Sequence, residues 1–432
     1  MQHRTTMPAA LAAAALLGHA ARAEEPATPA APSLAEVLAS SGISVTGYVD
    51  LSYEYLSGLG SFASGTADRV FDARHDSFTL HQAALTLARQ PKEGFGVLVN
   101  LTAGQDAPII KSYPNTGGSE FDVTQAYVQY ATGPLTLVGG KFVTLAGAET
   151  INPTTDTNFS RSILFGYAIP FTHTGLRASY ALSEQLSVTL GLNNGWDQVS
   201  DANSQKTLEY GMTFTPAKTL SLTVDGYLGR EPVGIVNNTP TAAGGQRALA
   251  DVVASWSVSD KITLVGNFDY GEQKDDSAGA AISKYRWDGA ALYLNYAITE
   301  QWSASLRGEF FDDKDGYRTG VLDGAGRGQK WRELTLTVAC APTKNMLLRF
   351  EARYDRSGVA DAFVESADGG GGALRFNDQQ SSIAVEASTG SSAARAAPGV
   401  RPACSAPPGR RRGRRRSRLH APGPASTAPA RR

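Results

Sequence analysis

Apolar and polar side chains alternate strictly from residue 176 to residue 193, except at the turn Ser183–Gln185. The apolar positions are Leu176, Ala178, Tyr180 and Leu182 before the turn and Leu186, Val188, Leu190 and Leu192 after it. A period of two predicts two antiparallel strands, each with one apolar and one polar face. Each arm has roughly the ten residues that a tilted strand needs to cross a bilayer.

The same pattern recurs and predicts about sixteen strands. The expected ranges are 43–56, 74–89, 94–104, 119–131, 134–144, 171–182, 185–194, 206–215, 220–229, 246–257, 261–272, 284–297, 301–312, 329–341, 345–356 and 378–387. Short turns alternate with long loops, as in bacterial outer-membrane barrels. A β-sandwich would not segregate its long loops so cleanly, and a propeller needs a regular four-strand repeat. We therefore expect an all-β, transmembrane, antiparallel up-and-down β-barrel.

The two faces of these strands differ in charge. One face carries apolar residues without a charge, for example Leu208, Tyr210, Met212 and Phe214. The other face carries Arg177, Glu209, Asp225, Arg247, Asp251, Asp269, Arg307, Glu309, Glu333, Arg349, Glu351, Arg353 and Asp355. A dry core would not hold so many ions, because desolvating each one costs several kcal/mol. We expect lipid outside and a water-filled lumen inside, which a closed barrel of this size can enclose.

The loop 145–170 is too apolar for an ordinary solvated loop. Its apolar residues include Ile163, Leu164, Phe165, Tyr167 and Ile169. Inward folding against the barrel wall would bury them and narrow the pore, whereas packing on the outer rim would leave the pore open. A short helix is expected from Ser162 to Phe165, with Asn158 or Ser160 as its cap.

Twelve charged residues are the candidates for the pore lining. Glu149, Asp156 and Arg161 lie in the loop, and Lys141 and Arg177 lie on the strands beside it. The remaining lumen candidates are Asp225, Asp251, Arg307, Glu309, Arg349, Glu351 and Arg353. A ring of mixed charges at a constriction would set a transverse field and select solutes by charge.

Four segments resemble the OmpL-like family of β-barrel porins. They are Gly42–Asp50, Phe121–Val128, Asn158–Ser162 and Ile169–Gly175, and the resemblance extends over residues 34–387. It implies an outer-membrane barrel of a Gram-negative bacterium that acts as a porin. It does not imply a particular solute.

The ends of the chain differ from the barrel in composition. Residues 1–23 have the polar start, apolar centre and small-x-small end of a signal peptide, with a disordered Ala-rich leader as the alternative. Residues 24–42 are expected to be flexible, with Ser33 and Glu36 spaced as a capping box. Residues 43–387 form the expected barrel. The last 45 residues hold eleven of the 40 Lys and Arg and no acid, which leaves 29 bases against 41 acids elsewhere.

The segment 388–432 is expected to be disordered because Pro, Ala, Gly, Ser and Arg cannot build a core. It is either a basic arm for a nucleic acid or an anionic surface, or the product of a reading-frame slip near codon 388. Under the second interpretation the natural chain would end on an aromatic residue a few positions after Ala387. Resequencing of the gene would separate the two.

The motifs of catalysis are missing from the sequence. No serine lies in a GxSxG motif, the histidines and the two cysteines, Cys340 and Cys404, have no metal-ligand spacing, and no phosphate-binding loop follows a strand. We expect no enzyme, cofactor, metal or nucleic-acid partner. A diffusion pore for small hydrophilic solutes is favoured over a structural or adhesive barrel and over a barrel hydrolase. Its partners would be outer-membrane lipid and lipopolysaccharide, with a homotrimer left open.

Overall fold

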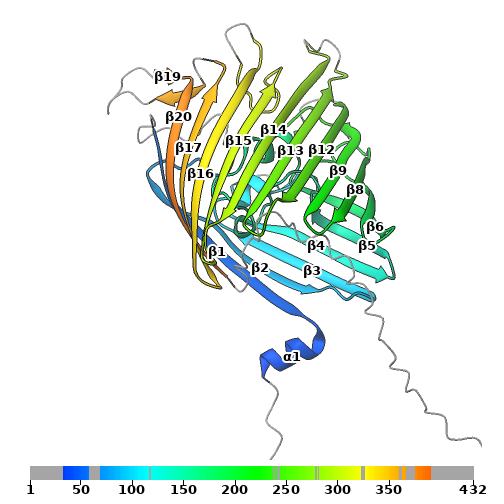
Figure 1. Ribbon diagram of the computed structural model, residues 1–432. Helices are drawn as coiled ribbons and strands as arrows, with labels where there is room; N and C mark the ends of the chain where they lie inside the picture. The colour runs from blue at the N-terminus through cyan, green and yellow to red at the C-terminus, as the bar shows by residue number, and fades with distance from the viewer. Residues whose placement is uncertain are drawn as a thin grey trace, which may run out of the picture. The chain divides into compact units, whose positions relative to one another are not determined.

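Sixteen strands close into one antiparallel barrel (Figure 1). The computed structural model describes residues 33–57, 69–115, 118–236, 239–240, 244–277, 280, 282–322, 326–359, 362–365 and 375–390. The barrel strands are β1 (Ser44–Leu56), β2 (Ser77–Arg89), β3 (Gly94–Ala103), β4 (Phe121–Thr132), β5 (Leu135–Val143), β6 (Thr172–Ala181), β7 (Leu186–Asn193), β8 (Thr207–Ala217), β9 (Leu220–Glu231), β12 (Gly245–Ser257), β13 (Ile262–Lys274), β14 (Lys284–Ala297), β15 (Trp302–Asp313), β16 (Gln329–Thr343), β17 (Met346–Ser357) and β20 (Gln379–Gly390). The predicted number of strands and the up-and-down order are confirmed.

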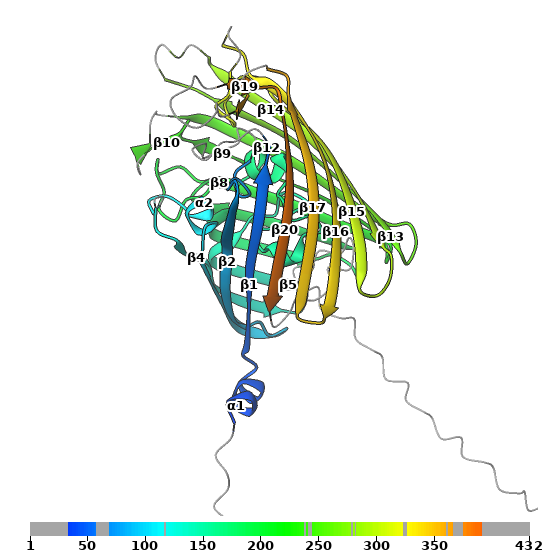
Figure 2. The same cartoon turned by 90° about the vertical axis from the view of Figure 1, so that its left-hand side faces the viewer.

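The barrel closes where the last strand, β20, lies between β17 and β1 (Figure 2). Thr389 pairs with Val49 on one side and with Met346 on the other. The strand therefore continues three residues beyond the predicted end at 387. Backbone pairing extends it after the apolar alternation has stopped, because the ladder is made by main-chain groups that any residue supplies.

The remaining elements are not strands of the barrel sheet. They are α1 (Leu34–Ser41), α2 (Ala107–Ile110), the 3₁₀-helix η1 (Pro153–Thr155), the π-helix η2 (Leu164–Ala168), and the short strands β10 (Ile235–Val236), β11 (Thr239–Pro240), β18 (Phe363–Glu365) and β19 (Arg375–Asn377). Within the described residues, no helix is long and apolar enough to cross a membrane.

The helix α1 belongs to a unit separate from the barrel. It begins with the predicted capping box: Glu36 N–H donates to Ser33 Oγ at 3.3 Å, and Ser33 N–H donates to a Glu36 carboxylate oxygen at 2.7 Å. The predicted signal peptide, the start of the flexible segment, Cys404 and the tail after Gly390 lie outside the described residues. Their assignments stay predictions.

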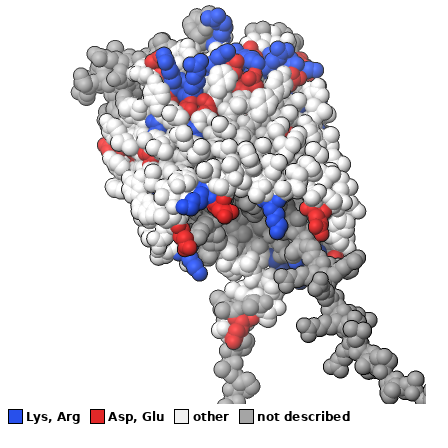
Figure 3. All heavy atoms as spheres, viewed as in Figure 1, with Lys and Arg blue, Asp and Glu red and all other residues white. Residues whose placement is uncertain are grey.

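The two strand faces separate as the alternation predicts. Leu336 on β16 is 50% exposed, whereas Thr335 and Thr337 beside it are 0% and 1% exposed. All of the charged positions predicted to face inward are buried. In the view of Figure 3, Lys, Arg, Asp and Glu gather mostly towards the two rims, with a largely uncharged band between them. This band has the properties of a lipid-facing surface.

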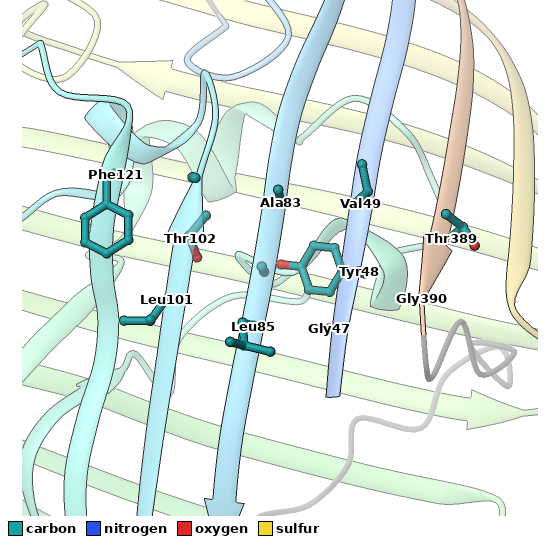
Figure 4. A pocket seen from close by; sticks show the side chains of 12 residues that line it. Gly47, Tyr48, Val49, Ala83, Leu85, Leu101, Thr102, Phe121, Thr389 and Gly390 are labelled. Carbon is teal, nitrogen blue, oxygen red and sulfur yellow. The ribbon is translucent and has the colours of Figure 1, made fainter. Parts of the chain in front are cut away.

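A shallow groove crosses the wall from β20 over β1, β2 and β3 to β4 (Figure 4). The exposed side chains of Val49, Leu85 and Phe121 border it, and Gly47 and Ala83 lie between them. The small residues leave a depression in the apolar band.

A charge in the middle of this band should destabilise the barrel. We expect Leu336→Arg to lower the free energy of unfolding by about 2–4 kcal/mol, because an ionised side chain would face hydrocarbon near mid-depth. The matched control Leu220→Arg lies at the first residue of β9, near the short turn, and should cost about 0–1 kcal/mol. Urea unfolding of protein refolded in lipid vesicles measures both. Equal losses would contradict the assignment of the band to hydrocarbon.

Candidate functional site

The loop 144–171 between β5 and β6 contacts the inward-facing side chains of distant strands. Gly147 N–H donates to Asp251 of β12 at 3.1 Å, and Ala148 N–H donates to Asn267 of β13 at 2.8 Å. The side-chain amide of Asn158 donates to Thr337 of β16 at 2.7 Å. The loop therefore lies against the inner wall of the barrel.

Apolar side chains account for this position. Ile163, Leu164, Phe165 and Ile169 are at most 2% exposed. They belong to a buried cluster that also includes Phe71, Trp196, Trp287, Phe311 and Trp331. Burying a side chain of this size is worth about 1.5–3 kcal/mol, so the loop gains more from the interior than from a wet rim.

The short helix of this loop is displaced from its expected position. It runs from Leu164 to Ala168 as a π-helix rather than from residue 162 to 165. The prediction of Asn158 or Ser160 as its cap is wrong, because Asn158 binds Thr337 and Ser160 N–H donates to Glu351. Instead, Ser162 Oγ accepts the N–H of Phe165 at 3.0 Å.

Two glutamates of the wall bind pairs of amide groups in the loop. Glu309 of β15 accepts the N–H groups of Ile163 and Leu164, both at 2.8 Å. Glu351 of β17 accepts those of Phe159 and Ser160 at 2.7 and 3.0 Å. A carboxylate that accepts two adjacent backbone donors makes strong, charge-assisted hydrogen bonds.

Three arginines of the same wall bind carbonyl groups of the loop. Arg307 donates to Ser160 O at 2.7 Å, and Arg349 donates to Pro153 O and Asp156 O at 2.7 and 2.6 Å. Arg353 donates to Arg161 O at 2.7 Å. Each arginine also pairs with an acid, at distances of 2.7–3.1 Å: the acids are Glu149 and Glu333 for Arg307, Glu386 for Arg349 and Asp355 for Arg353.

The three charged candidates within the loop face one another or the wall. Glu149 accepts from Arg307 at 2.7 Å and from Ser162 N–H at 2.7 Å. Asp156 lies 3.4 Å from Arg161, whose guanidinium also lies 5.6 Å from the ring centre of Phe71. Burial raises the pKa of Asp156 to about 7, and the positive charge of Arg161 opposes that rise.

The structure brings nine of the twelve candidates together at this loop; the other three lie on the wall beside it. Lys141 pairs with Asp122 at 3.1 Å, and Arg177 pairs with Glu209 at 3.0 Å between Nη2 and Oε2. Asp225 lies opposite Asp251 in the register of β9 and β12.

A second inward segment was missed from the sequence. Arg69 pairs with Glu54 at 2.6 Å and with Asp355 at 2.7 Å, and Asp72 accepts the N–H of Arg161 at 3.2 Å. The alternation on β1 could have identified Glu54. Arg69 and Asp72 lie in a loop, where no periodic signal marks the direction of a side chain.

The described side chains at the loop are a mixture of charged and apolar groups. No group of three or more His, Cys, Asp or Glu in the described ranges is placed to hold a metal ion. His173, the buried histidine of β6, is stacked on Tyr227 with 4.4 Å between ring centres, and its Nδ1 lies 3.0 Å from Gly195 O. These contacts are those of a packed, hydrogen-bonded histidine.

The family model described as "Putative beta-barrel porin-2, OmpL-like" matches residues 42–388. No curated protein sequence matches the chain significantly. Among solved structures, an anion-selective porin from Comamonas acidovorans has a TM-score of 0.54 at 13% identity, covering 81% of this chain and 99% of that chain. Pseudomonas putida OprB has a TM-score of 0.53 at 14% identity, covering 82% and 95%. The trimer form of Vibrio cholerae OmpT has a TM-score of 0.52 at 9% identity, covering 81% and 98%. At these identities the likeness establishes the fold alone.

Removing one amide-binding charge should loosen the loop locally. We expect the amides of Phe159 and Ser160 to exchange about tenfold faster in Glu351→Gln, because a neutral side-chain amide cannot accept both N–H groups as a carboxylate does. Hydrogen–deuterium exchange with mass spectrometry measures this. The matched control Glu209→Gln removes an equally buried acid that pairs with Arg177 instead. Similar exchange in both variants would contradict the tethering role of Glu351.

Proposed function

We propose that this chain, which belongs to the OmpL-like family of β-barrel porins and lies in the bacterial outer membrane, is a channel for passive diffusion of small hydrophilic solutes. The observation that carries the proposal is the charged inner wall. Acids and bases face inward along strands of a closed barrel whose outer band is apolar. Such a lining suits a hydrated passage, because even paired charges cost more to bury in a dry interior than to place beside water.

The loop 145–170 would be the constriction of this channel. Glu309, Glu351 and Arg349 fix its backbone from one side of the wall. Asp156 and Arg161 pair at 3.4 Å on this held segment, so protonation of Asp156 would leave the positive charge of Arg161 unbalanced at the constriction. A loop fixed in this way can select by size and charge without moving.

A non-conducting structural or adhesive barrel is the second candidate. The buried apolar cluster favours it, since Ile163, Phe165, Trp287 and Trp331 occupy the interior where solutes would pass. A hydrolase is less well supported, because the ring of His173 is stacked against Tyr227.

The partners follow from the outer surface. Outer-membrane lipid and lipopolysaccharide would cover the apolar band, with an acyl chain in the groove beside Gly47 and Ala83. A homotrimer is proposed from the fold, because Vibrio cholerae OmpT is described in a trimer form.

Conductance separates the pore from the structural barrel. Replacing residues 150–166 with a short Gly-Ser linker should raise the single-channel conductance in planar bilayers, because it removes the proposed constriction. Deleting residues 199–204 from another loop is the control and should leave the conductance unchanged. If neither the wild type nor the replacement variant conducts ions, the result would favour the structural barrel. An unchanged conductance on replacement would show that the loop does not limit the pore.

The pH should alter the ion preference through Asp156. With its pKa raised to about 7, this acid is mostly neutral at pH 5 and charged at pH 9. It is faced by Arg161, Glu149 and Arg349. The ratio of cation to anion permeability should therefore rise as pH increases through 7 in the wild type and lose that step in Asp156→Asn, as measured by reversal potentials in a salt gradient.

The control for this experiment is Asp201→Asn. Burial of Asp201 is outweighed by its hydrogen bond with Lys206, so its pKa is lowered and it stays charged over the whole range. Removing the charge of Asp201 should change the ratio of cation to anion permeability at every pH. The rise of this ratio near pH 7 should remain. If the permeability ratio rises equally near pH 7 in Asp156→Asn and in the wild type, titration of Asp156 does not cause the rise.

A further inference from the structure

An open groove of about 420 Å³ lies at the long-loop ends of β8, β9, β12 and β13, which are neighbours in the barrel (Figure 1). Its lining includes three bases and one acid, namely Lys206, Arg230, Lys274 and Asp276. The long loops of outer-membrane barrels are extracellular, so this end of the strands belongs to the outer leaflet.

The charged side chains of this groove point away from the barrel interior. Arg230 and Lys274 are exposed, whereas their neighbours Glu231 and Gln273 are buried on the opposite face of the same strands. Leu228, two residues before Arg230, also lines the groove and is 40% exposed within the apolar band. The groove therefore has one edge on the lipid-facing band and one charged edge towards the loops.

Two lysines lie opposite each other at this end of β13 and β14. Lys274 is the partner of Lys284 in the register of the two strands, and like charges in such a position repel each other. Lys284 pairs with Glu272, whereas the ammonium group of Lys274 donates to the neutral amide oxygen of Gln246 at 3.3 Å. Among the described residues, Lys274 forms no ion pair with a carboxylate.

The acids beside the groove are held in exposed contacts. Asp276 pairs with Arg230 at 2.8 Å, and these two side chains are 44% and 47% exposed. Asp201 pairs with Lys206, which is 46% exposed. Ion pairs in contact with water contribute little to stability, so a ligand with a larger negative charge can replace a single carboxylate at low cost.

We propose that this groove binds the phosphate group of an outer-leaflet lipid, with Lys274 and Arg230 as the donors and Leu228 beside the acyl chains. Lys and Arg at a membrane surface attract anionic headgroups, and the fork of a guanidinium matches two phosphate oxygens. Both donors are exposed in an open groove, so a headgroup can reach them from the membrane. The inference rests on the lipid partner of the proposed function and is independent of conduction through the barrel.

The test is native mass spectrometry of the refolded full-length protein in detergent. Phosphatidic acid is the probe, diacylglycerol with the same acyl chains is the control without a phosphate, and inorganic phosphate is the control without acyl chains. We expect phosphatidic acid to bind more tightly than either control. Lys274→Gln should weaken its binding about fivefold, and the double variant with Arg230→Gln about twenty-five-fold, because each base near a membrane surface contributes about the same factor.

Two further variants make the test specific to the groove. Lys218→Gln removes one exposed base from the short turn between β8 and β9, at the other end of the same strands, and should bind like the wild type. Asp276→Asn should strengthen binding, because it releases Arg230 from its ion pair. Retention of the heat-modifiable barrel band on gels shows that each variant has folded. If the double variant fails this check, Lys274→Gln and Asp276→Asn decide.

Three outcomes would overturn the proposal. They are equal binding of phosphatidic acid and diacylglycerol by the wild type, equal affinities of Lys274→Gln and Lys218→Gln, and inorganic phosphate binding as tightly as phosphatidic acid. The last outcome would assign the groove to free phosphate instead of a lipid.

Conductance of the same preparations separates this proposal from the porin function. A wild type that conducts without preferring phosphatidic acid would retain the porin function and lose this site. Specific binding by a wild type that does not conduct would retain the site and remove the porin function.

Discussion

Every backbone group of a loop placed inside a barrel needs a hydrogen-bond partner, and charged side chains of the wall supply several of these partners. Glu309 and Glu351 take the amide groups, and Arg307, Arg349 and Arg353 take the carbonyl groups. Unpaired buried polar groups would each cost about 1–3 kcal/mol. The loop is held inside because both its apolar side chains and its backbone find partners there.

The barrel was predictable from the sequence because a single period of two governs it. A strand with one face in lipid and the other facing charged neighbours alternates apolar and polar residues at successive positions. Leu336 is exposed and apolar, whereas its neighbour Thr335 is buried and polar. The ends were less predictable. Thr389 and Gly390 continue β20 through main-chain pairing, which leaves no trace in side-chain alternation.

The candidate site was predictable where its residues lie on strands. The alternation places four of them on the inward face of their strands, and the structure has them buried there: Arg307, Glu309, Arg349 and Glu351. The sequence could not show that Arg69 crosses from a loop to Glu54 and Asp355. It also could not show the register shift after Asp50, which places the successive residues His81 and Gln82 of β2 both in the interior.

The tethers of the inner loop have a consequence for the order of assembly. Phe159 is bound by a residue 192 positions later, and Pro153 by one 196 positions later. Contacts between such distant parts of a chain form late, because the chain loses conformational entropy on closing the intervening segment before the contact can stabilise it. The loop can dock only after β15 and β17 have joined the sheet. Until then, its apolar side chains and amide groups remain without the strands that cover them in the closed barrel.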